Sequence, residues 1–493
     1  MAQVLPKEGS ALNYRIIGIS FPATEGTGKY KVEIALGNYN SADSFRSHII
    51  QTLHTKDNRV VAEVPLFGSS YTWRVSGRSD KNTDAAALHH FSTTTIPEMD
   101  TSNTRLRVLQ QAKKYKDAYV FMDGNRAMYD MDGNAVWYLP DIDGFKTEKS
   151  LLRDMKLTPQ GTITFMYEEK GAYEINLNGD ILWKAPNDGT VSGEKQEEYH
   201  HEITRLANGH YMVLGIENEL WNRHLPSADS SYKIFPLSTA VIADSNKRNY
   251  EKDPFGTVIE YDQKGNVVWS WKSSDYFRNS DIYYKKGRNG QPELAAHENS
   301  FFFDEGTQTI YIGFRNISRI VKVKYPEGKV LDTYGELYKP DVPEAGNGLF
   351  CRQHCVRHSP DGYLYLYDNN SCAHSGVSRI LKLEEPATPG DGLKKIWEYD
   401  CTTEGVLPGQ KVSFQFAVGG DVMELPDHCL FVNMSTSYSK VFILSPDKEM
   451  LWSAIPEKWN PRFKRWDMVY QYRASMITSR KDLENLVWSA ETK

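Results

Sequence analysis

The segment YDMDGNAVWY at 129–138 carries the pattern that decides the fold: a strand, a tight Asp-Gly turn and a second strand that contains tryptophan. Five looser copies of this hairpin follow along the chain. They are INLNGDILWK at 175–184, EYDQKGNVVWSW at 260–271, VKYPEGKVLD at 323–332, EPATPGDGLKKIWEY at 385–399 and FILSPDKEMLWS at 442–453. A hairpin that recurs in this way indicates a modular β architecture.

A second hairpin signal lies upstream of each copy. These signals are KDAYVFMD at 116–123, TPQGTITFM at 158–166, ANGHYMVLG at 207–215, EGTQTIYIG at 305–313, PDGYLYLYD at 360–368 and PDHCLFVNM at 426–434. Two hairpins in each of six repeats predict six four-stranded blades, so we expect a six-bladed β-propeller over residues 114–493. The repeated tryptophans are interpreted as packing residues between blades.

The first part of the chain follows a different pattern. Segments such as KYKVEIAL and SYTWRVSG alternate apolar and polar residues between turn residues, which predicts a small β-sandwich of fibronectin or immunoglobulin type over residues 1–97. Tyr71 and Trp73 are its expected core residues. We expect a linker and one helix at 98–113, with the helix around Arg105 to Lys114. The predicted fold class is therefore all-β.

Composition narrows the classes of function. The chain has 493 residues and a net charge of -6, which argues against nucleic acid as a partner. No apolar run approaches the roughly 20 residues that a membrane span needs, and no signal-peptide core follows Met1. The N-terminus is therefore either a native start or the remnant of a trimmed secretion signal. No P-loop or glycine-rich phosphate cradle is visible, and we expect no cofactor.

Three histidines recur in the proposed innermost strands. Each lies seven residues before an acidic or amide residue at the turn: His201 before Asn208, His297 before Asp304 and His354 before Asp361. Equal register in successive blades predicts that the three imidazoles converge on the propeller axis. The same register favours His201 over its neighbour His200, because a shift of one residue reverses the face of a strand.

The turn in the second histidine hairpin also predicts a cross-strand neighbour. Reflecting the strand about that turn places Arg315 opposite His297, and Asn299 points to the same side as His297. The same operation on the third hairpin places Asn369 beside His354 and Cys372 beside Cys351.

Imidazoles, a guanidinium and a carboxamide together form a donor-rich pocket for an anion. Arginine offers paired N–H groups that suit sulfate, phosphate or carboxylate. A neutral imidazole can also attack an electrophilic sulfur or phosphorus atom and hold the group covalently. Taken singly, each remaining histidine has a simpler interpretation as an ordinary strand or loop residue; these are His200, His210, His224, His358 and His374.

At these residues the chain resembles the bacterial arylsulfate sulfotransferases, which need no nucleotide sulfate donor. HENSFFFDEGTQTIYIGFRNIS at 297–318 is similar to that family's His-x-Asn-Ser and Arg-x-x-Ser segments, and HHEITRLANG and QHCVRHSPDG are similar to its other two histidine segments. The resemblance extends from the N-terminal region through all six repeats. It implies ping-pong transfer of a sulfuryl group from a phenolic sulfate ester to another phenol.

The resemblance also implies roles for individual residues. His354 matches the nucleophile that becomes sulfated, and His201, His297, Asn299 and Arg315 match groups that hold the sulfuryl oxygens. We add Asn369 and His200, beside these positions, as candidate substrate-binding residues and expect no metal. Cys355 follows the nucleophile where many relatives have Asp, so the partner that orients the imidazole must come from elsewhere.

The family's usual setting is the periplasm, which favours a disulfide. Cys351 with Cys372 is the pair that the reflection suggests, and Cys351 with Cys355 is an alternative. The sequence does not determine the oligomeric state, and a homodimer is compatible with it.

Two other classes of function remain open at this stage. Histidines on a propeller axis can bind iron, manganese or zinc, although the cationic Arg315 beside a divalent metal is electrostatically costly. A non-catalytic propeller that binds a partner is the other alternative, but a buried donor cluster would then have no purpose.

Overall fold

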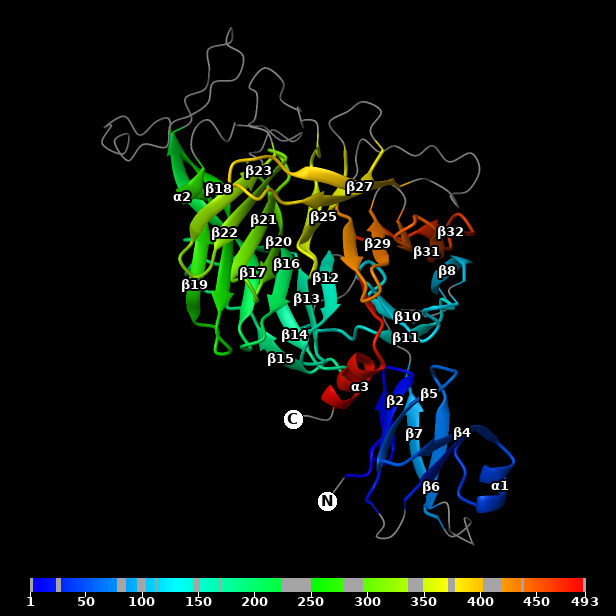
Figure 1. Cartoon of the computed structure of the whole chain (residues 1–493). Helices are drawn as coiled ribbons and strands as arrows, with labels where there is room; N and C mark the ends of the chain where they lie inside the picture. Colours follow the sequence, from blue (N-terminus) through cyan, green and yellow to red (C-terminus); the bar gives the residue numbers. More distant parts are fainter. Residues whose placement is uncertain are drawn as a thin grey trace.

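The computed structural model describes residues 3–23, 28–77, 86–94, 103–111, 113–144, 151–168, 170–222, 250–277, 296–335, 349–370, 377–401, 418–435 and 439–490. Within these residues the protein is nearly all β, with three short helices (Figure 1). None of these helices has the length and apolar character needed to cross a membrane.

The N-terminal unit contains a five-stranded sheet in the order β1-β7-β6-β3-β4 and a two-stranded sheet of β2 and β5. Tyr71 and Trp73 are fully buried there, as the alternation of apolar residues predicts. The elements are β1 (Ser10–Leu12), β2 (Ile16–Ser20), β3 (Tyr30–Leu36), α1 (Ala42–Arg46), β4 (Ile49–Thr55), β5 (Arg59–Glu63), β6 (Ser70–Gly77) and β7 (His89–Thr93).

Six further sheets follow, which we number I to VI in chain order. Sheets II to V each consist of four consecutive antiparallel strands, as two hairpins per repeat predict. Sheet II contains β12 (Leu152–Leu157), β13 (Ile163–Tyr167), β14 (Gly171–Ile175) and β15 (Ile181–Lys184). Sheet III contains β16 (Tyr199–Arg205), β17 (Tyr211–Asn222), β18 (Tyr250–Tyr261) and β19 (Val267–Lys272), and α2 (Ser273–Tyr276) follows it. Sheet IV contains β20 (Glu298–Asp304), β21 (Thr309–Phe314), β22 (Arg319–Lys324) and β23 (Lys329–Tyr334). Sheet V contains β24 (His354–His358), β25 (Tyr363–Asp368), β26 (Arg379–Glu384) and β27 (Lys394–Asp400).

Sheets I and VI contain strands from both ends of this region. Sheet I has the order β11-β10-β9-β33, so a strand from the end of the chain pairs with β9. Its strands are β9 (Tyr119–Met122), β10 (Ala127–Asp130), β11 (Ala135–Tyr138) and β33 (Ala474–Ile477). Sheet VI contains β28 (Asp421–Glu424), β29 (Leu430–Met434), β30 (Lys440–Leu444), β31 (Met450–Asn460), β32 (Arg465–Met468) and β8 (Thr104–Gln110).

The helix expected around Arg105 to Lys114 is wrong, because this segment contains the strand β8. It pairs antiparallel with β31, from Thr104 opposite Lys458 to Gln110 opposite Ser453. Leu106 points inward and is buried, whereas Arg105 and Arg107 are partly exposed. Leucine, arginine and glutamine are good helix formers, but helix propensity is readily overridden by tertiary contacts, and here pairing with the long strand β31 outweighs it.

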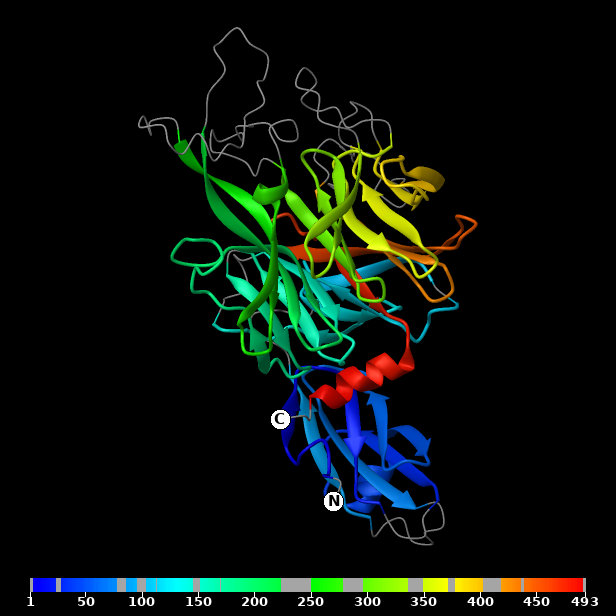
Figure 2. The ribbon, with the colours of Figure 1, turned by 60° about the vertical axis from the view of Figure 1, so that its left-hand side comes forward.

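The N-terminal unit packs against the larger sheets through the C-terminal helix α3 (Arg480–Ser489), which lies between the two parts (Figures 1 and 2). One continuous core cluster contains buried residues of the N-terminal sheets, of sheets I and II and of α3. Gly18 lies so close to α3 that a β-carbon there would approach Val487 and Trp488 to 2.9 Å. The two parts therefore share a hydrophobic core.

Candidate active site

The candidate site is built on the first strands of sheets II to V, each of which carries a β-bulge near its start. One residue beside or within each bulge has a positive φ: Asp154, His201, His297 and Cys355, at 53° to 61°. A bulge bends a strand and redirects its side chains, and bulges are frequent next to active sites. Backbone strain of this kind at non-glycine residues is typical of functional positions.

A ladder of hydrogen bonds links these first strands and defines their relative register. In each step, a backbone N–H donates to a side chain of the preceding sheet: Ile203 to Asp154 (2.9 Å), Phe301 to Glu202 (3.0 Å), Val356 to Ser300 (3.3 Å) and Val422 to Cys355 (3.4 Å). The residues that immediately precede these acceptors therefore occupy equivalent positions. They are Arg153, His201, Asn299 and His354.

The predicted equal register is thus confirmed for His201 and His354 but wrong for His297, which lies two residues before the equivalent position at Asn299. The positions were counted back from one turn residue in each hairpin, and these three turn residues are not equivalent. Asp304 is the last paired residue of its strand, opposite Thr309, whereas the corresponding residues of the other two hairpins lie within their turns.

The structure nevertheless brings the histidines together. The ring centroids of His201 and His297 are 5.2 Å apart and nearly perpendicular. Nδ1 of His200 lies 2.7 Å from Nδ1 of His201. His200 also contacts the Gly215 carbonyl through Nε2, at 3.1 Å. His200 thus contacts His201 through one ring nitrogen and the backbone of β17 through the other.

His354 is held in a defined orientation. Its Nδ1 lies 2.5 Å from Oδ1 of Asn369, and the Asn369 amide donates in turn to the Gly419 carbonyl at 3.0 Å. An amide oxygen can only accept, so Nδ1 carries the proton and Nε2 carries the lone pair. The Gly419 N–H donates to that Nε2 at 3.1 Å. Asn369 is therefore the orienting partner that the sequence left unassigned.

The reflection that paired Asn369 with His354 predicted the side-chain contact but not the backbone register. In the sheet, His354 lies opposite Tyr367, and the register shifts between His354 and Arg357. The turn shifts the pairing by one residue, since Arg357 lies opposite Tyr365, and the bulge shifts it by a second. The Cys351 carbonyl correspondingly accepts from the Asn370 N–H.

Arg315 lies where the sequence predicts, across from His297: its backbone N–H donates to the His297 carbonyl at 2.9 Å. Burial, followed by the Arg315 charge, holds the pKa of His297 and of His354 well below the ordinary value. Burial also lowers the pKa of His201, and the neighbouring His200 lowers it further. The imidazoles are therefore neutral at physiological pH.

Asn299 is fully buried, and its amide is already engaged: Nδ2 donates to the Gln353 carbonyl at 2.8 Å. Asn299 thus supports the backbone immediately before His354.

Two further residues complete the cluster and were missed from the sequence. The Tyr472 ring lies 5.5 Å from the His201 ring and 6.0 Å from the His354 ring, and the Arg153 guanidinium lies 4.1 Å above it. Tyr472 is 3% exposed, and within the described part of the chain its hydroxyl has no hydrogen-bond partner. Because buried hydroxyls are normally paired, this oxygen is available to a bound ligand.

Arg153 had a signal that repeat counting does not use, because it occupies in sheet II the position of His201 in sheet III. Tyr472 had no such signal, because it lies two residues before β33, the strand that joins sheet I from the end of the chain.

A buried network of charges lies beside the histidines. Arg473 bridges Asp154 (3.1 Å) and Glu202 (3.0 Å) and donates to the Asn299 carbonyl (3.0 Å). Arg357 contacts the other Glu202 oxygen at 2.9 Å. Although burial raises the pKa of Glu202, the surrounding cations lower it to about 2. These ion pairs, together with the hydrogen bond to Asn299, connect sheets II, III, IV and V.

The structure tests one of the two predicted disulfide pairs. Cys355, Cys401 and Cys429 are free thiols, which excludes the Cys351–Cys355 pair. Cys372 and His374 lie outside the described residues. Cys355 donates to the Asp421 carboxylate, and this Asp lies 3.5 Å from Arg357. Asp421 thus supplies a carboxylate beside Cys355.

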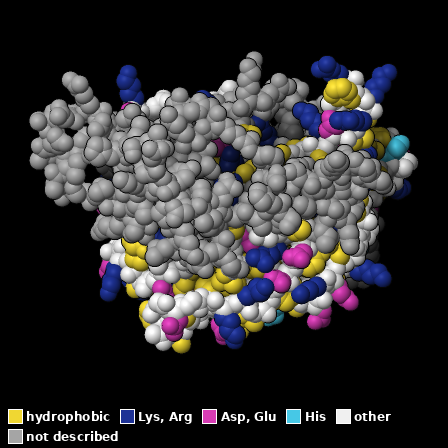
Figure 3. All heavy atoms as spheres, turned by 90° about the horizontal axis from the view of Figure 1, so that it is seen from above, with side chains coloured by type: hydrophobic (Ala, Val, Ile, Leu, Met, Phe, Trp, Pro, Cys, Tyr) yellow, Lys and Arg dark blue, Asp and Glu magenta, His cyan; other side chains and the backbone are white. Residues whose placement is uncertain are grey.

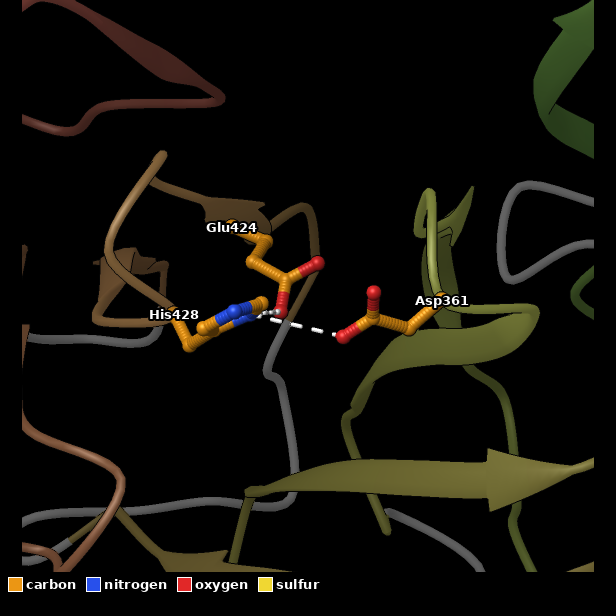
Figure 4. Close-up of side chains that lie close together, drawn as sticks. All are labelled: Asp361, Glu424 and His428. Atoms are coloured by element: carbon orange, nitrogen blue, oxygen red, sulfur yellow. Dashed lines mark hydrogen bonds and ion pairs between the residues drawn. The ribbon is translucent and has the colours of Figure 1, made fainter.

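One group of potential metal ligands occurs among the described residues, away from the histidine cluster. It consists of Asp361, Glu424 and His428, with His428 Nδ1 3.1 Å from Glu424 and 3.5 Å from Asp361 (Figure 4). Asp361 and His428 are exposed. Exposed acidic groups of this kind are common, and we assign no ligand to this one.

The upper surface of the molecule is mixed in charge where the structure describes it. Acidic and basic side chains are interspersed with apolar ones, and neither sign dominates (Figure 3).

Comparison with known proteins identifies the family. A family model described as "Arylsulfotransferase (ASST)" matches residues 95–232 and 237–384, more than half of the chain. The protein therefore belongs to the arylsulfotransferase family. Membership implies a sulfotransferase enzyme that acts on small-molecule substrates, as the resemblance of the histidine segments predicted.

The other comparisons show only distant similarity. No curated protein matches the chain. Similar solved structures include a protein of unknown function from Bacteroides caccae, with 13% identity over 73% of this chain and 98% of that one and a TM-score of 0.40. Another is apo AztD from Citrobacter koseri, with 8% identity over 91% of this chain and 98% of that one and a TM-score of 0.32. No argument about function rests on these similarities.

Proposed function

We propose that the protein transfers a sulfuryl group from an aryl sulfate to a phenol in two steps, with His354 as the covalent carrier. The observation that carries this proposal is the state of His354: a buried, neutral imidazole whose Nδ1–H is fixed by Asn369 and whose Nε2 holds the lone pair. A neutral, oriented imidazole with an available lone pair is an activated nucleophile.

In the first step, Nε2 attacks sulfur, the S–N bond forms and the bond from sulfur to the aryl oxygen breaks. The leaving phenolate departs with the bond's electron pair. For this attack, Nε2 must first release its hydrogen bond from the Gly419 N–H. In the second step, an acceptor phenol gives its proton to solvent, its oxygen attacks sulfur, the S–N bond breaks and His354 regains its lone pair.

The neighbouring donors stabilise the negative charge on the sulfuryl oxygens. Arg315 contributes a fixed cation, and His297 contributes a neutral ring N–H group. The Nδ1–H of His201 is taken by Nδ1 of His200, whose Nε2–H donates to the Gly215 carbonyl, so His201 donates to a sulfuryl oxygen only when the bound anion brings a proton to its Nε2. Tyr472, whose hydroxyl has no hydrogen-bond partner among the described residues, donates to the same group or to the departing oxygen. Fixed donors of this kind act on charge as it develops, without the reorganisation that water requires. His200 serves this site indirectly, because it touches Nδ1 of His201.

We propose that sheets I to VI are the six blades of a β-propeller over residues 114–493. The repeated four-stranded order and the joining of β33 to sheet I support this proposal, because a strand from the chain end that completes the first sheet joins the two ends of a circular array. The two N-terminal sheets then form a β-sandwich within residues 1–97, with 98–113 as the connection.

The same proposal places the protein in the periplasm, with Cys351 and Cys372 paired. Its support is that Cys351, unlike Cys355, Cys401 and Cys429, is not a free thiol. Mass spectrometry of peptides under non-reducing conditions tests the pairing, and alkylation of all five cysteines without reductant would contradict it.

The test of the chemistry is an incubation with an aryl sulfate and no acceptor. One sulfuryl adduct should appear on the peptide that contains His354 and disappear when a phenol is added. His354→Ala should abolish both the adduct and turnover, and His210→Ala, in the turn after β16, should retain both. Turnover by an enzyme that never carries the adduct would mean direct transfer or another nucleophile.

A further inference from the structure

A cleft of about 590 Å³ lies on one face of β8, β31 and β32, at the edge of the molecule where these strands extend from sheet VI (Figure 1). None of its lining residues belongs to the histidine cluster. Its volume falls within the range of small-molecule sites.

Strand register arranges the lining of this cleft. Ile455 lies opposite Arg107, Glu457 opposite both Arg105 and Met468, and Trp459 opposite Trp466. Side chains alternate between the two faces of a strand, so these residues share one face. The two tryptophans meet edge to face, with centroids 5.7 Å apart.

Two of the cations in the cleft are fixed. Glu457, whose side chain is 5% exposed, accepts from Arg105 at 2.7 Å and from Arg107 at 2.8 Å. The Arg105 guanidinium also lies 4.0 Å from the centroid of the Trp466 ring. A guanidinium held along one edge and stacked on an aromatic face keeps its remaining N–H groups directed at a ligand.

The charge of the cleft favours an anion. Arg105, Arg107, Lys464 and Arg465 line it together with only two carboxylates. Both carboxylates are already paired, Glu457 with the two arginines of β8 and Asp467 with Arg465 at 2.6 Å. A divalent cation would therefore find no free carboxylate here.

We propose that this cleft binds an organic anion with a flat aromatic body. The edge-to-face tryptophans form an apolar corner for the ring, and Arg107 and Lys464 meet its sulfonate, sulfate or carboxylate group. An inorganic anion would leave the tryptophan corner unfilled, and a neutral aromatic would leave the cations unpaired.

Binding can be measured directly with naphthalene-2-sulfonate, whose C–S bond cannot be transferred. In protein labelled with 5-fluorotryptophan, ¹⁹F NMR resolves signals from the 11 tryptophans, and Trp459→Phe and Trp466→Phe assign the two in the cleft. We expect a saturable shift of these two signals. Neutral 2-naphthylmethanol should bind at least about tenfold more weakly, and sodium sulfate alone should move neither signal.

A matched pair of charge reversals tests the role of the cations. Lys464→Glu and Arg462→Glu change the same charge in the same exposed turn, but only Lys464 lines the cleft. The first should weaken binding at least about tenfold and the second by less than about twofold. The proposal is overturned if neither tryptophan signal moves, if the neutral alcohol binds equally well, or if the two reversals have the same effect. Both signals belong to this cleft, so the result does not depend on sulfuryl transfer at His354.

Discussion

At the scale of single residues, the hydroxyl of Tyr472 is the group whose removal separates function from stability. The Tyr472 ring lies beside His201 and His354, and its buried hydroxyl has no hydrogen-bond partner in the described structure. Tyr472→Phe should therefore leave the free energy of unfolding unchanged or slightly higher, because an unpaired buried hydroxyl stabilises nothing. If this hydroxyl holds the sulfuryl group or the departing oxygen, kcat/KM for an aryl sulfate should fall about tenfold, the loss of one hydrogen bond of about 1.4 kcal/mol. Urea unfolding and steady-state kinetics on the same preparation measure both effects, and a variant that is less stable but fully active would refute this role.

The neutral state of His354 predicts how activity depends on pH. Burial and the Arg315 charge hold its pKa below the ordinary value of about 6.5. Nε2 therefore keeps its lone pair as the pH falls through 6.5, and kcat/KM should retain its plateau below that pH. A protonation that halves kcat/KM at about 6.5 would contradict the buried, neutral imidazole.

Folding stability, unlike kcat/KM, should depend on pH in this range. The unfolded chain binds protons at these histidines near pH 6.5, whereas the folded cluster does not. The free energy of unfolding should therefore be fully retained above about pH 6.5 and decrease as the pH falls below it. Denaturant titrations at a series of pH values test this, and His354→Gln, which cannot be protonated, should flatten part of the dependence.

Much of the site could be predicted from its residue types, because three histidines, an arginine and two asparagines all lie in the hairpins that begin with a histidine strand. The register could be predicted only in part. The turn residues used as the reference are not equivalent between the hairpins, so His297 was placed level with His201 although Asn299 holds that position. Arg153 escaped notice because it occupies the same position with a different side chain.

At the scale of elements, β8 is where local preference and tertiary pairing disagree. Gly133 in the β10–β11 turn (φ 86°) approaches this strand so closely that a β-carbon would lie 2.1 Å from the Leu106 carbonyl oxygen. Gly362 has nearly the same φ, 84°, but nothing within 4 Å. Gly362→Ala should cost only the conformational penalty of about 1–2 kcal/mol. Gly133→Ala should cost roughly 1–3 kcal/mol more, because the β8 backbone must shift. Thermal unfolding of the two variants gives the comparison, and equal losses would mean that β8 is loosely attached.

The strands of sheets II to V were predictable because each hairpin carries its own turn and its own alternation of apolar residues. The partner of β9 was not, since β33 lies more than 350 residues away in the chain. Repeat patterns describe local pairing, whereas closure depends on contacts between the two ends of the region. For the same reason Tyr472, which precedes β33, could not be assigned to the site.

At the scale of the whole molecule, Arg473 connects sheets that are distant in sequence. Its guanidinium, 1% exposed, binds Asp154 of sheet II, Glu202 of sheet III and the Asn299 carbonyl of sheet IV, and its backbone N–H donates to Asp123 after β9 at 2.7 Å. A single residue from the end of the chain thus holds four sheets in place beside the histidines. Geometry at the site and closure of the sheets depend on the same contacts.

Arg473→Met should therefore destabilise the whole protein. Removing the cation leaves Asp154 and Glu202 buried with fewer partners, a loss of about 3–5 kcal/mol. Arg465→Met, which removes an exposed arginine paired with Asp467, should cost less than about 1 kcal/mol. Adding Glu202→Gln to Arg473→Met should cost less than the sum of the two single changes, because one uncompensated carboxylate is then gone. Denaturant unfolding of the four variants measures these differences. Additive effects, or an Arg473→Met variant as stable as Arg465→Met, would show that the sheets are held together by their hydrophobic contacts alone.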